Sequence, residues 1–174
     1  MNLDRNIIPP HRPPPGPDND FYCAHIERLR RSLIALNGRD LTPGVPVPET
    51  AARMLWDHPS LLLSHGTEPD PILNYGNRAT LELFELDWDS LVRMPSRLTA
   101  EAPDRAERER LFQNVARHGY IDDYQGVRIS SSGRRFRIEK ATVWTVRNPD
   151  GSIAGQAAWI QHWSPAFSSQ TPPG

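Results

Sequence analysis

The stretch that decides the fold lies in the last third of the chain. It reads YIDDYQGVRISSSGRRF at residues 120–136, RIEKATVW at 137–144 and SIAGQAAWIQHW at 152–163. Apolar residues recur here with a period of two, which is typical of β-strands. The turn sequence SSG separates the first two segments, and NPDG at residues 148–151 places proline and glycine where a tight turn favours them. The pattern predicts three long antiparallel strands.

The alternation within these strands is not uniform. Phe136, Ile138 and Trp144 share one parity, but the phase of the apolar pattern changes near Lys140. Such a change predicts a β-bulge or a strand that is covered on both faces. Gly155 lies among small residues in the last strand, which predicts that a helix or a ligand packs closely against it.

The middle of the chain predicts a hairpin followed by a run of short helices. Gly, Pro and Asp separate the two apolar runs of the hairpin. Asn77, Asp87 and Asp104 are residues of the type that caps the first turn of a helix, and an apolar pattern follows each of them. The predicted elements are strands at residues 61–64 and 72–75 and helices at residues 78–86, 88–93 and 105–118.

The N-terminal part predicts a disordered tail and then a helical extension. Residues 1–19 contain six prolines and few large apolar residues. Asp20 is expected to cap a helix that ends at Gly38, and a second short helix is expected at residues 49–57. The first of these helices carries a narrow apolar stripe made of Tyr22, Ile26, Leu29, Leu33 and Leu36. The stripe has to pack either on its own domain or on the same helix of a second subunit, so a homodimer through Phe21 to Leu36 is one expectation.

Composition excludes several classes of protein. The 174 residues include 20 Lys and Arg against 21 Asp and Glu, for a net charge of -1, so no nucleic-acid partner is predicted. Cys23 is the single cysteine and cannot form an intrachain disulfide. No apolar run has the length of a membrane span or the pattern of a secretion signal. A cytoplasmic protein without a membrane partner is expected.

The order of the predicted elements and the amino-acid sequences of several segments resemble one known family. Two strands, several short helices and three antiparallel strands follow the order of PAS domains. The segments LLLSHGTEPDPILNYGNRATLELFELDW, MPSRLTAE, GYIDDYQGVRISSSGRRFRIEKATVW and GQAAWIQHW are similar to the MEKHLA family of PAS-like domains. The resemblance covers residues 58–163 nearly without gaps, although the six-letter run that names the family is absent.

The resemblance implies an α+β fold with a five-stranded antiparallel sheet in the order 2-1-5-4-3 and short helices over one face. The expected domain spans residues 58–163, after a helical extension at 20–57 and before a disordered tail at 164–174. In plants this domain ends transcription factors that carry a homeodomain and a leucine zipper, and nothing in this sequence resembles either. The free-standing form found in bacteria is therefore expected.

In a PAS-like fold a ligand lies between the helices and the face of the sheet that they cover. Arg128 and Gln156 are of special interest because a buried charge or amide needs a partner, and a ligand carboxylate is one candidate. The predicted pocket residues are the polar and aromatic side chains on these elements: Tyr75, Asn77, Phe84, Trp88, Arg97, Tyr124, Arg128, Trp144 and Gln156.

No motif in the sequence indicates a particular chemical reaction. His65, Glu68 and Asp70 are metal-ligand types in one loop, but such residues usually close a turn, so neither a metal site nor catalytic residues are predicted. We expect a PAS-like sensory or interaction module that binds a small organic ligand or a protein partner and forms dimers. The alternatives are a small metabolic enzyme or accessory factor that uses the same concavity, or a carrier of haem or flavin, and the cofactor stays unknown.

Overall fold

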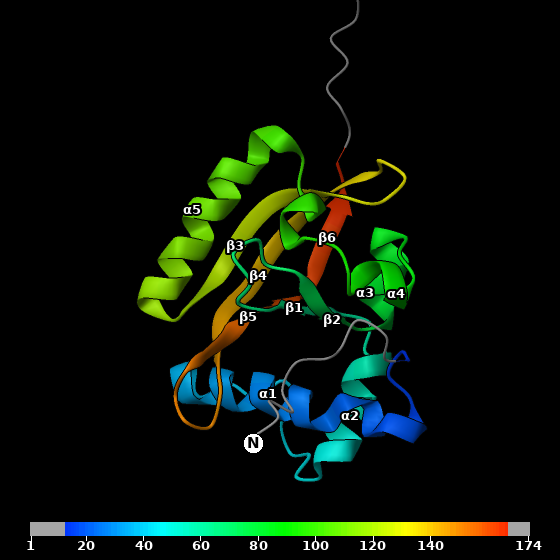
Figure 1. The fold of residues 1–174 in the computed structure, drawn as a ribbon, viewed down its shortest axis with the longest axis vertical. Helices are drawn as coiled ribbons and strands as arrows, with labels where there is room; N and C mark the ends of the chain where they lie inside the picture. Colours follow the sequence, from blue (N-terminus) through cyan, green and yellow to red (C-terminus); the bar gives the residue numbers. More distant parts are fainter. Residues whose placement is uncertain (1–12, 167–174) are drawn as a thin grey trace, which may run out of the picture.

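The chain folds into an antiparallel sheet with helices on both faces (Figure 1), and its computed structural model describes residues 13–166. The strands are β1 (Leu61–His65), β2 (Leu73–Gly76), β3 (Tyr120–Ile129), β4 (Arg135–Arg147), β5 (Ile153–Ile160) and β6 (His162–Pro165). The helices are η1 (Pro17–Tyr22), α1 (Cys23–Asn37), α2 (Pro48–Asp57), α3 (Arg78–Phe84), α4 (Trp88–Leu91), η2 (Ser96–Thr99) and α5 (Ala102–His118). None of the helices in this part of the chain is long and apolar enough to cross a lipid bilayer.

The sheet has the predicted order β2-β1-β5-β4-β3, with four antiparallel pairings along it, and a sixth strand pairs with β4. Strand β6 pairs with the first half of β4, so that Ile138 lies opposite Trp163 and Phe136 lies opposite Pro165. Residues 164 and 165 therefore continue the sheet, although a disordered tail was predicted from residue 164 onward. The rest of that tail, residues 167–174, lies outside the described residues, as do residues 1–12 of the predicted N-terminal tail.

A bulge in β4 decides which face each of its side chains occupies. Lys140 has a φ of 50°, and the pairing with β3 steps from Tyr124 opposite Ala141 to Gly126 opposite Ile138. Three residues of β4 thus span two residues of β3, which confirms the bulge predicted near Lys140. Because of the extra residue, side chains of equal parity before and after Lys140 point to opposite faces of the sheet.

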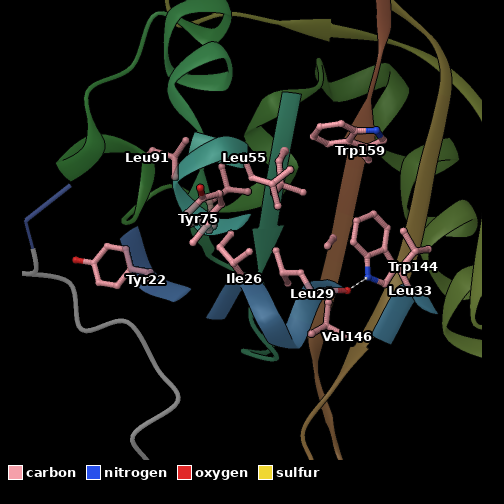
Figure 2. Packing of buried hydrophobic residues seen from close by; sticks show 14 of the residues in the cluster. Tyr22, Ile26, Leu29, Leu33, Leu55, Tyr75, Leu91, Trp144, Val146 and Trp159 are labelled. Carbon is pink, nitrogen blue, oxygen red and sulfur yellow. Dashed lines mark hydrogen bonds between the residues drawn. The ribbon is translucent and has the colours of Figure 1, made fainter. Parts of the chain in front are cut away.

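We call the face of the sheet beneath α1 and α2 the outer face. Trp144, Trp159 and Leu62 lie on it in one cluster with the apolar stripe of α1, and Figure 2 shows Trp144 beside Leu29 and Leu33. The indole Nε1 of Trp144 donates a hydrogen bond to the backbone oxygen of Leu29 at 3.1 Å. The buried residues of the stripe are Tyr22, Ile26, Leu29 and Leu33. The stripe therefore covers the sheet of its own chain, and a homodimer through the same stripe would lack its contact surface.

The opposite face, which we call the inner face, lies beneath α5 and α3 (Figure 1). Gln156 of β5 donates from Nε2 to the backbone oxygen of Phe112 at 3.0 Å, and Thr145 of β4 donates to the backbone oxygen of Val115 at 3.3 Å. These two bonds fix α5 across the sheet. The helix covers the inner face without filling all of the space above it.

Helix ends follow the predictions at some positions and depart from them at others. Asn77 and Asp87 cap α3 and α4 through side-chain oxygens, as predicted. Helix α1 begins at Cys23 and not after Asp20, because residues 20–22 adopt left-handed backbone angles at the end of η1. Helix α5 begins at Ala102 with Glu101 at the N-cap position, so Asp104 lies inside the helix instead of capping it.

The close packing predicted at Gly155 comes from the neighbouring strand. A Cβ atom at this position would lie 1.9 Å from the backbone oxygen of His65, and the φ of Gly155 is 144°. The close neighbour is therefore the backbone at the end of β1 and not a helix or a ligand. Only glycine fits here, because both the space and the backbone angle exclude a side chain.

Candidate ligand cavity

A cavity of about 40 Å³ lies between α5 and the inner face of the sheet. Its walls are mainly apolar, and its polar side chains come from α5, β1, β3, β5 and η2. The residues that line it include Leu63, His65, Phe84, Arg108, Phe112, Tyr124, Arg128, Ile138, Val143, Gln156, Ala158 and Ile160. A volume of this size holds a few waters, and an organic molecule of several heavy atoms fits only if the cavity widens.

Arg108 reaches the cavity from the second turn of α5. It lies four residues before Phe112, so the two side chains share one face of the helix, and its guanidinium lies 4.3 Å from the centre of the Phe112 ring. Only 6% of the residue is exposed. Its Nε is buried and makes no hydrogen bond within residues 13–166. The contact with the Phe112 ring therefore helps to stabilise this charge.

Arg128 reaches the same cavity from β3, on the opposite side. Its Nη2 donates a hydrogen bond to the hydroxyl of Tyr124 at 2.5 Å, and its Nη1 donates to the backbone oxygen of Val127 at 2.9 Å. Its guanidinium lies 5.2 Å from the centre of the Tyr124 ring. Like Arg108, Arg128 is only 6% exposed. Neutral groups of its own strand therefore hold Arg128 in place.

The cavity carries an uncompensated positive charge. None of the described residues that line it is Asp or Glu. No ion pair joins Arg108 or Arg128 to a carboxylate in the part of the chain that the structure describes. Burial, together with the nearby charge of Arg128, lowers the pKa of Arg108 to about 10. Two buried guanidiniums thus share one small space, an arrangement that is costly unless an anion joins them.

Neutral polar side chains also line the cavity, among them Gln156 and His65. Gln156 uses its Nε2 to bind the backbone of α5, while its Oε1 is buried without a hydrogen-bond partner among the described residues. The Nδ1 of His65 lies 2.8 Å from the backbone oxygen of Gly66 and therefore carries the proton. Burial lowers the pKa of His65, which keeps the ring neutral. The positive charge of the site hence comes from the two arginines.

The structure brings together four of the nine predicted pocket residues. Phe84, Tyr124, Arg128 and Gln156 line the cavity. Among the other five, Tyr75, Trp88 and Trp144 belong to the hydrophobic cluster beneath α1. Trp144 was expected on the inner face because it shares its parity with Phe136 and Ile138, and the bulge at Lys140 places it on the outer face.

Asn77 and Arg97 also lie away from the cavity. Asn77 is fully buried: its Oδ1 accepts from the backbone N–H groups of Thr80 and Leu62, and its Nδ2 donates to the backbone oxygens of Leu55 and Ser60. All of its hydrogen-bonding capacity is therefore used within the protein. Arg97 is exposed, and its Nε donates to the carboxylate of Asp70 at 3.1 Å.

Arg108 and His65 are cavity residues that were not among the predicted ones. Helix α5 has so many charged residues that Arg108 looks like part of a solvated face. A signal for it was nevertheless present, because Arg108, Phe112 and Val115 follow the spacing of a single buried helix face. The loop after His65 closes on itself: Glu68 accepts from the backbone of Ile72, and Asp70 pairs with Arg97.

Comparisons with solved structures identify the fold as PAS-like. An RNA-binding light-oxygen-voltage receptor aligns with a TM-score of 0.60 and 22% identity, over 72% of this chain and 36% of that one. A PAS domain from Colwellia psychrerythraea aligns with a TM-score of 0.57 and 10% identity, over 65% of this chain and 93% of that one. At these identities the likeness shows a shared fold.

The sequence then defines the family within this fold. The model of the MEKHLA domain matches residues 23–165, and the chain belongs to this family. The match begins at the first residue of α1, so it includes the two helices that cover the outer face.

Curated relatives that match are plant proteins of much greater length. Homeobox-leucine zipper protein ATHB-14 of Arabidopsis thaliana is 30% identical over 143 residues, which cover 80% of this chain and 17% of that protein. Homeobox-leucine zipper protein ATHB-9 of the same plant is 30% identical over 121 residues, which cover 67% of this chain and 14% of that protein. This chain thus spans less than a fifth of the length of these relatives.

Proposed function

We propose that the chain is a PAS-like sensory module that binds a small organic ligand in the cavity between α5 and the inner face of the sheet. One observation carries the proposal: two buried polar atoms beside the cavity, the Nε of Arg108 and the Oε1 of Gln156, lack hydrogen-bond partners within the described residues. Buried polar atoms are normally paired, so unpaired ones that share a cavity favour a ligand as the missing partner.

Helix α5 is the element through which binding would be transmitted. It contributes Arg108 and Phe112 to the cavity, and the side chain of Gln156 joins its backbone to β5. A ligand that contacts Arg108 and Gln156 changes the contacts that hold α5 on the sheet. The exposed side of α5 would then present a ligand-dependent surface to a protein partner, which agrees with a sensory or interaction role.

A carrier of flavin is the alternative that the light-oxygen-voltage neighbours suggest, since one of them was studied with a flavin analogue. The cavity does not fit such a group. Sites for ligands of that size are roughly 300–1,000 Å³, whereas this cavity has about 40 Å³. An absorption spectrum of the purified protein tests this alternative, and a flavin or haem band would contradict the proposed small-ligand module.

A cavity-filling variant tests the proposal. Ala158 lies on the inner face in the middle of the sheet and lines the cavity, so Ala158→Leu places a larger side chain inside it. The matched control is Ala35→Leu on the exposed side of α1. Thermal unfolding of the wild type is screened against small neutral, acidic and basic organic compounds, and native mass spectrometry is used to look for a retained mass.

The proposal predicts at least one compound that raises the unfolding midpoint of the wild type and of Ala35→Leu but not of Ala158→Leu. If no compound distinguishes the filled cavity from the open one, and no mass is retained, the chain is not a ligand-binding module of this kind.

A further inference from the structure

We propose that the ligand is a small organic carboxylate, held with its anionic end between Arg108 and Arg128 and its carbon chain against the apolar wall of the cavity. This inference rests on the proposed ligand-binding function and specifies the chemistry of the ligand. It is carried by the placement of two buried guanidiniums beside one cavity whose described lining contains no acidic residue.

The two arginines come from elements that are far apart in the sequence and meet only in the folded protein. Arg108 is on α5 and Arg128 is on β3, and each is 6% exposed. Of the two arginines, Arg128 makes two hydrogen bonds to described residues: one to the hydroxyl of Tyr124 and one to the backbone oxygen of Val127. Because a guanidinium has five N–H donors, most of the donors of this pair are left for a ligand.

Charge favours an anion over a neutral ligand. Like charges in a space of low polarity repel each other, and the lowered pKa of Arg108 reflects both burial and the charge of Arg128. Glu109, the acidic residue that interacts with Arg108, is on the exposed side of α5 and not in the cavity. One bound anion would offset the repulsion and satisfy the free donors together.

The shape and lining of the cavity favour a carboxylate with a short carbon chain. The planar fork of a guanidinium matches the two oxygens of a carboxylate, and such pairs form short charge-assisted hydrogen bonds. Away from the arginines the wall consists of Leu63, Phe84, Ile138, Val143 and Ile160, which suit an apolar chain. Because the volume is small, even a short-chain acid enters only with a shift of the cavity wall, such as an outward movement of α5, and a bulky acid is excluded.

Sodium butyrate and butyramide provide a matched pair of probes, since they share a carbon skeleton and differ in charge. Thermal unfolding of the full chain is followed with each of them, with sodium chloride at equal ionic strength and with inorganic phosphate. Butyrate is expected to raise the midpoint by about 5–10 °C at roughly a hundred times its dissociation constant. Butyramide, chloride and phosphate are expected to leave the midpoint unchanged.

Substitution of the arginines tests the placement. Arg108→Gln and Arg128→Gln are each expected to weaken butyrate binding by about 10- to 100-fold, the loss typical of a hydrogen bond to a charged group. Arg117→Gln, at an exposed position near the end of α5, is the control and should bind like the wild type. If Arg128→Gln does not fold, Arg128→Lys keeps the charge and removes the fork, and it should also bind more weakly.

The outcomes separate this inference from the proposed function. If butyramide stabilises the protein as well as butyrate does, or only phosphate does, the cavity binds a ligand but the carboxylate assignment is wrong. In a second outcome, butyrate has no effect, but another compound raises the unfolding midpoint of the wild type and not of Ala158→Leu. The carboxylate assignment is then again wrong, and the proposed sensory module stands. If no compound acts at all, both proposals fail.

Discussion

The outer face of the sheet buries Trp144, Trp159 and Leu62 beneath α1, whereas the inner face places Arg108 and Arg128 beside a cavity of about 40 Å³. The same three central strands supply both faces. On the outer face Trp144 donates to the backbone of Leu29, and two buried atoms there that lack a partner among the described residues, the hydroxyl of Tyr75 and the Nδ1 of His25, are neutral. On the inner face, Arg128 binds neutral groups of its own strand, whereas the buried Nε of Arg108 has no hydrogen-bond partner among the described residues.

This difference shows how one small sheet serves two purposes. Dense apolar packing on the outer face contributes stability, at about 1.5–3 kcal/mol for each large side chain that is fully buried. The cavity and the unpaired charges on the inner face reduce stability and leave donors for a ligand. Substitutions on the two faces should therefore change the free energy of unfolding in opposite directions.

The largest effect is expected on the outer face. Trp144 is completely buried, and Trp144→Ala removes its ring from the core and leaves the backbone oxygen of Leu29 without its indole donor. We expect the free energy of unfolding to fall by about 3–5 kcal/mol in urea denaturation. Ile153→Ala, at a side chain that is 49% exposed, is the control and should change it by less than about 0.5 kcal/mol. A comparable loss in both variants would contradict the packing described for the outer face.

Acid should weaken the outer face through His25. This ring is on the buried side of α1, and its Nε2 lies 2.9 Å from the Oγ of Ser64. Burial, with the nearby charge of Arg28, lowers the pKa of His25 to about 3. The folded state therefore keeps His25 neutral, while the unfolded chain binds a proton below about pH 6.5. The stability that His25 contributes is present above that pH and is lost as the pH falls toward 3.

Between pH 7 and pH 5 the contribution of His25 to this loss is about 2 kcal/mol. It is measured as the difference in pH dependence between the wild type and His25→Gln. The exposed His162 supplies the control, since His162→Gln should keep the slope of the wild type. Identical slopes in the wild type and His25→Gln would show that His25 is not held neutral in the folded state.

A smaller effect of opposite sign is expected on the inner face. Arg108→Gln removes one of two buried like charges in the absence of a ligand, and the chain should gain about 1 kcal/mol in free energy of unfolding. The gain is limited because the contact between the guanidinium and the Phe112 ring is lost as well. Urea denaturation without added anion measures it, with Arg117→Gln as the control. A loss of more than about 1 kcal/mol would mean that Arg108 is a structural residue.

The smallest effect is expected outside both faces. Arg97 pairs with Asp70 on the surface, where the two side chains are 46% and 51% exposed. Arg97→Ala should change the free energy of unfolding by less than about 0.5 kcal/mol and should leave butyrate binding unchanged. Weaker binding in this variant would place the ligand nearer to η2 than the two buried arginines do.

Alternation and turn residues are local signals, and they were sufficient to predict β1 to β5 and the bulge, while the order of these strands came from the resemblance to the MEKHLA family and β6 was missed. The helix caps Asn77 and Asp87 could be predicted for the same reason. Which face a residue occupies after a bulge is not local. Trp144 was assigned to the pocket by its parity with Ile138, and the extra residue at Lys140 reversed that assignment.

The site was harder to predict than the fold because its charge depends on which elements meet. Arg128 and Gln156 stood out as polar residues in strands that face the core. Arg108 did not, since α5 contains several arginines and only packing against the sheet shows which of them is buried. The absence of an acidic residue among the described lining of the cavity likewise becomes visible only in three dimensions.

The central claim is that the inner face binds a carboxylate and the outer face does not. A titration of the full chain with sodium butyrate, followed by two-dimensional ¹H–¹⁵N NMR, tests it most directly. We predict saturable shifts of the side-chain signals of Arg108 Nε and Gln156 Nε2, with little change at the indole Nε1 of Trp144 on the outer face. Shifts centred on Trp144, or an equal response to butyramide, would contradict the claim.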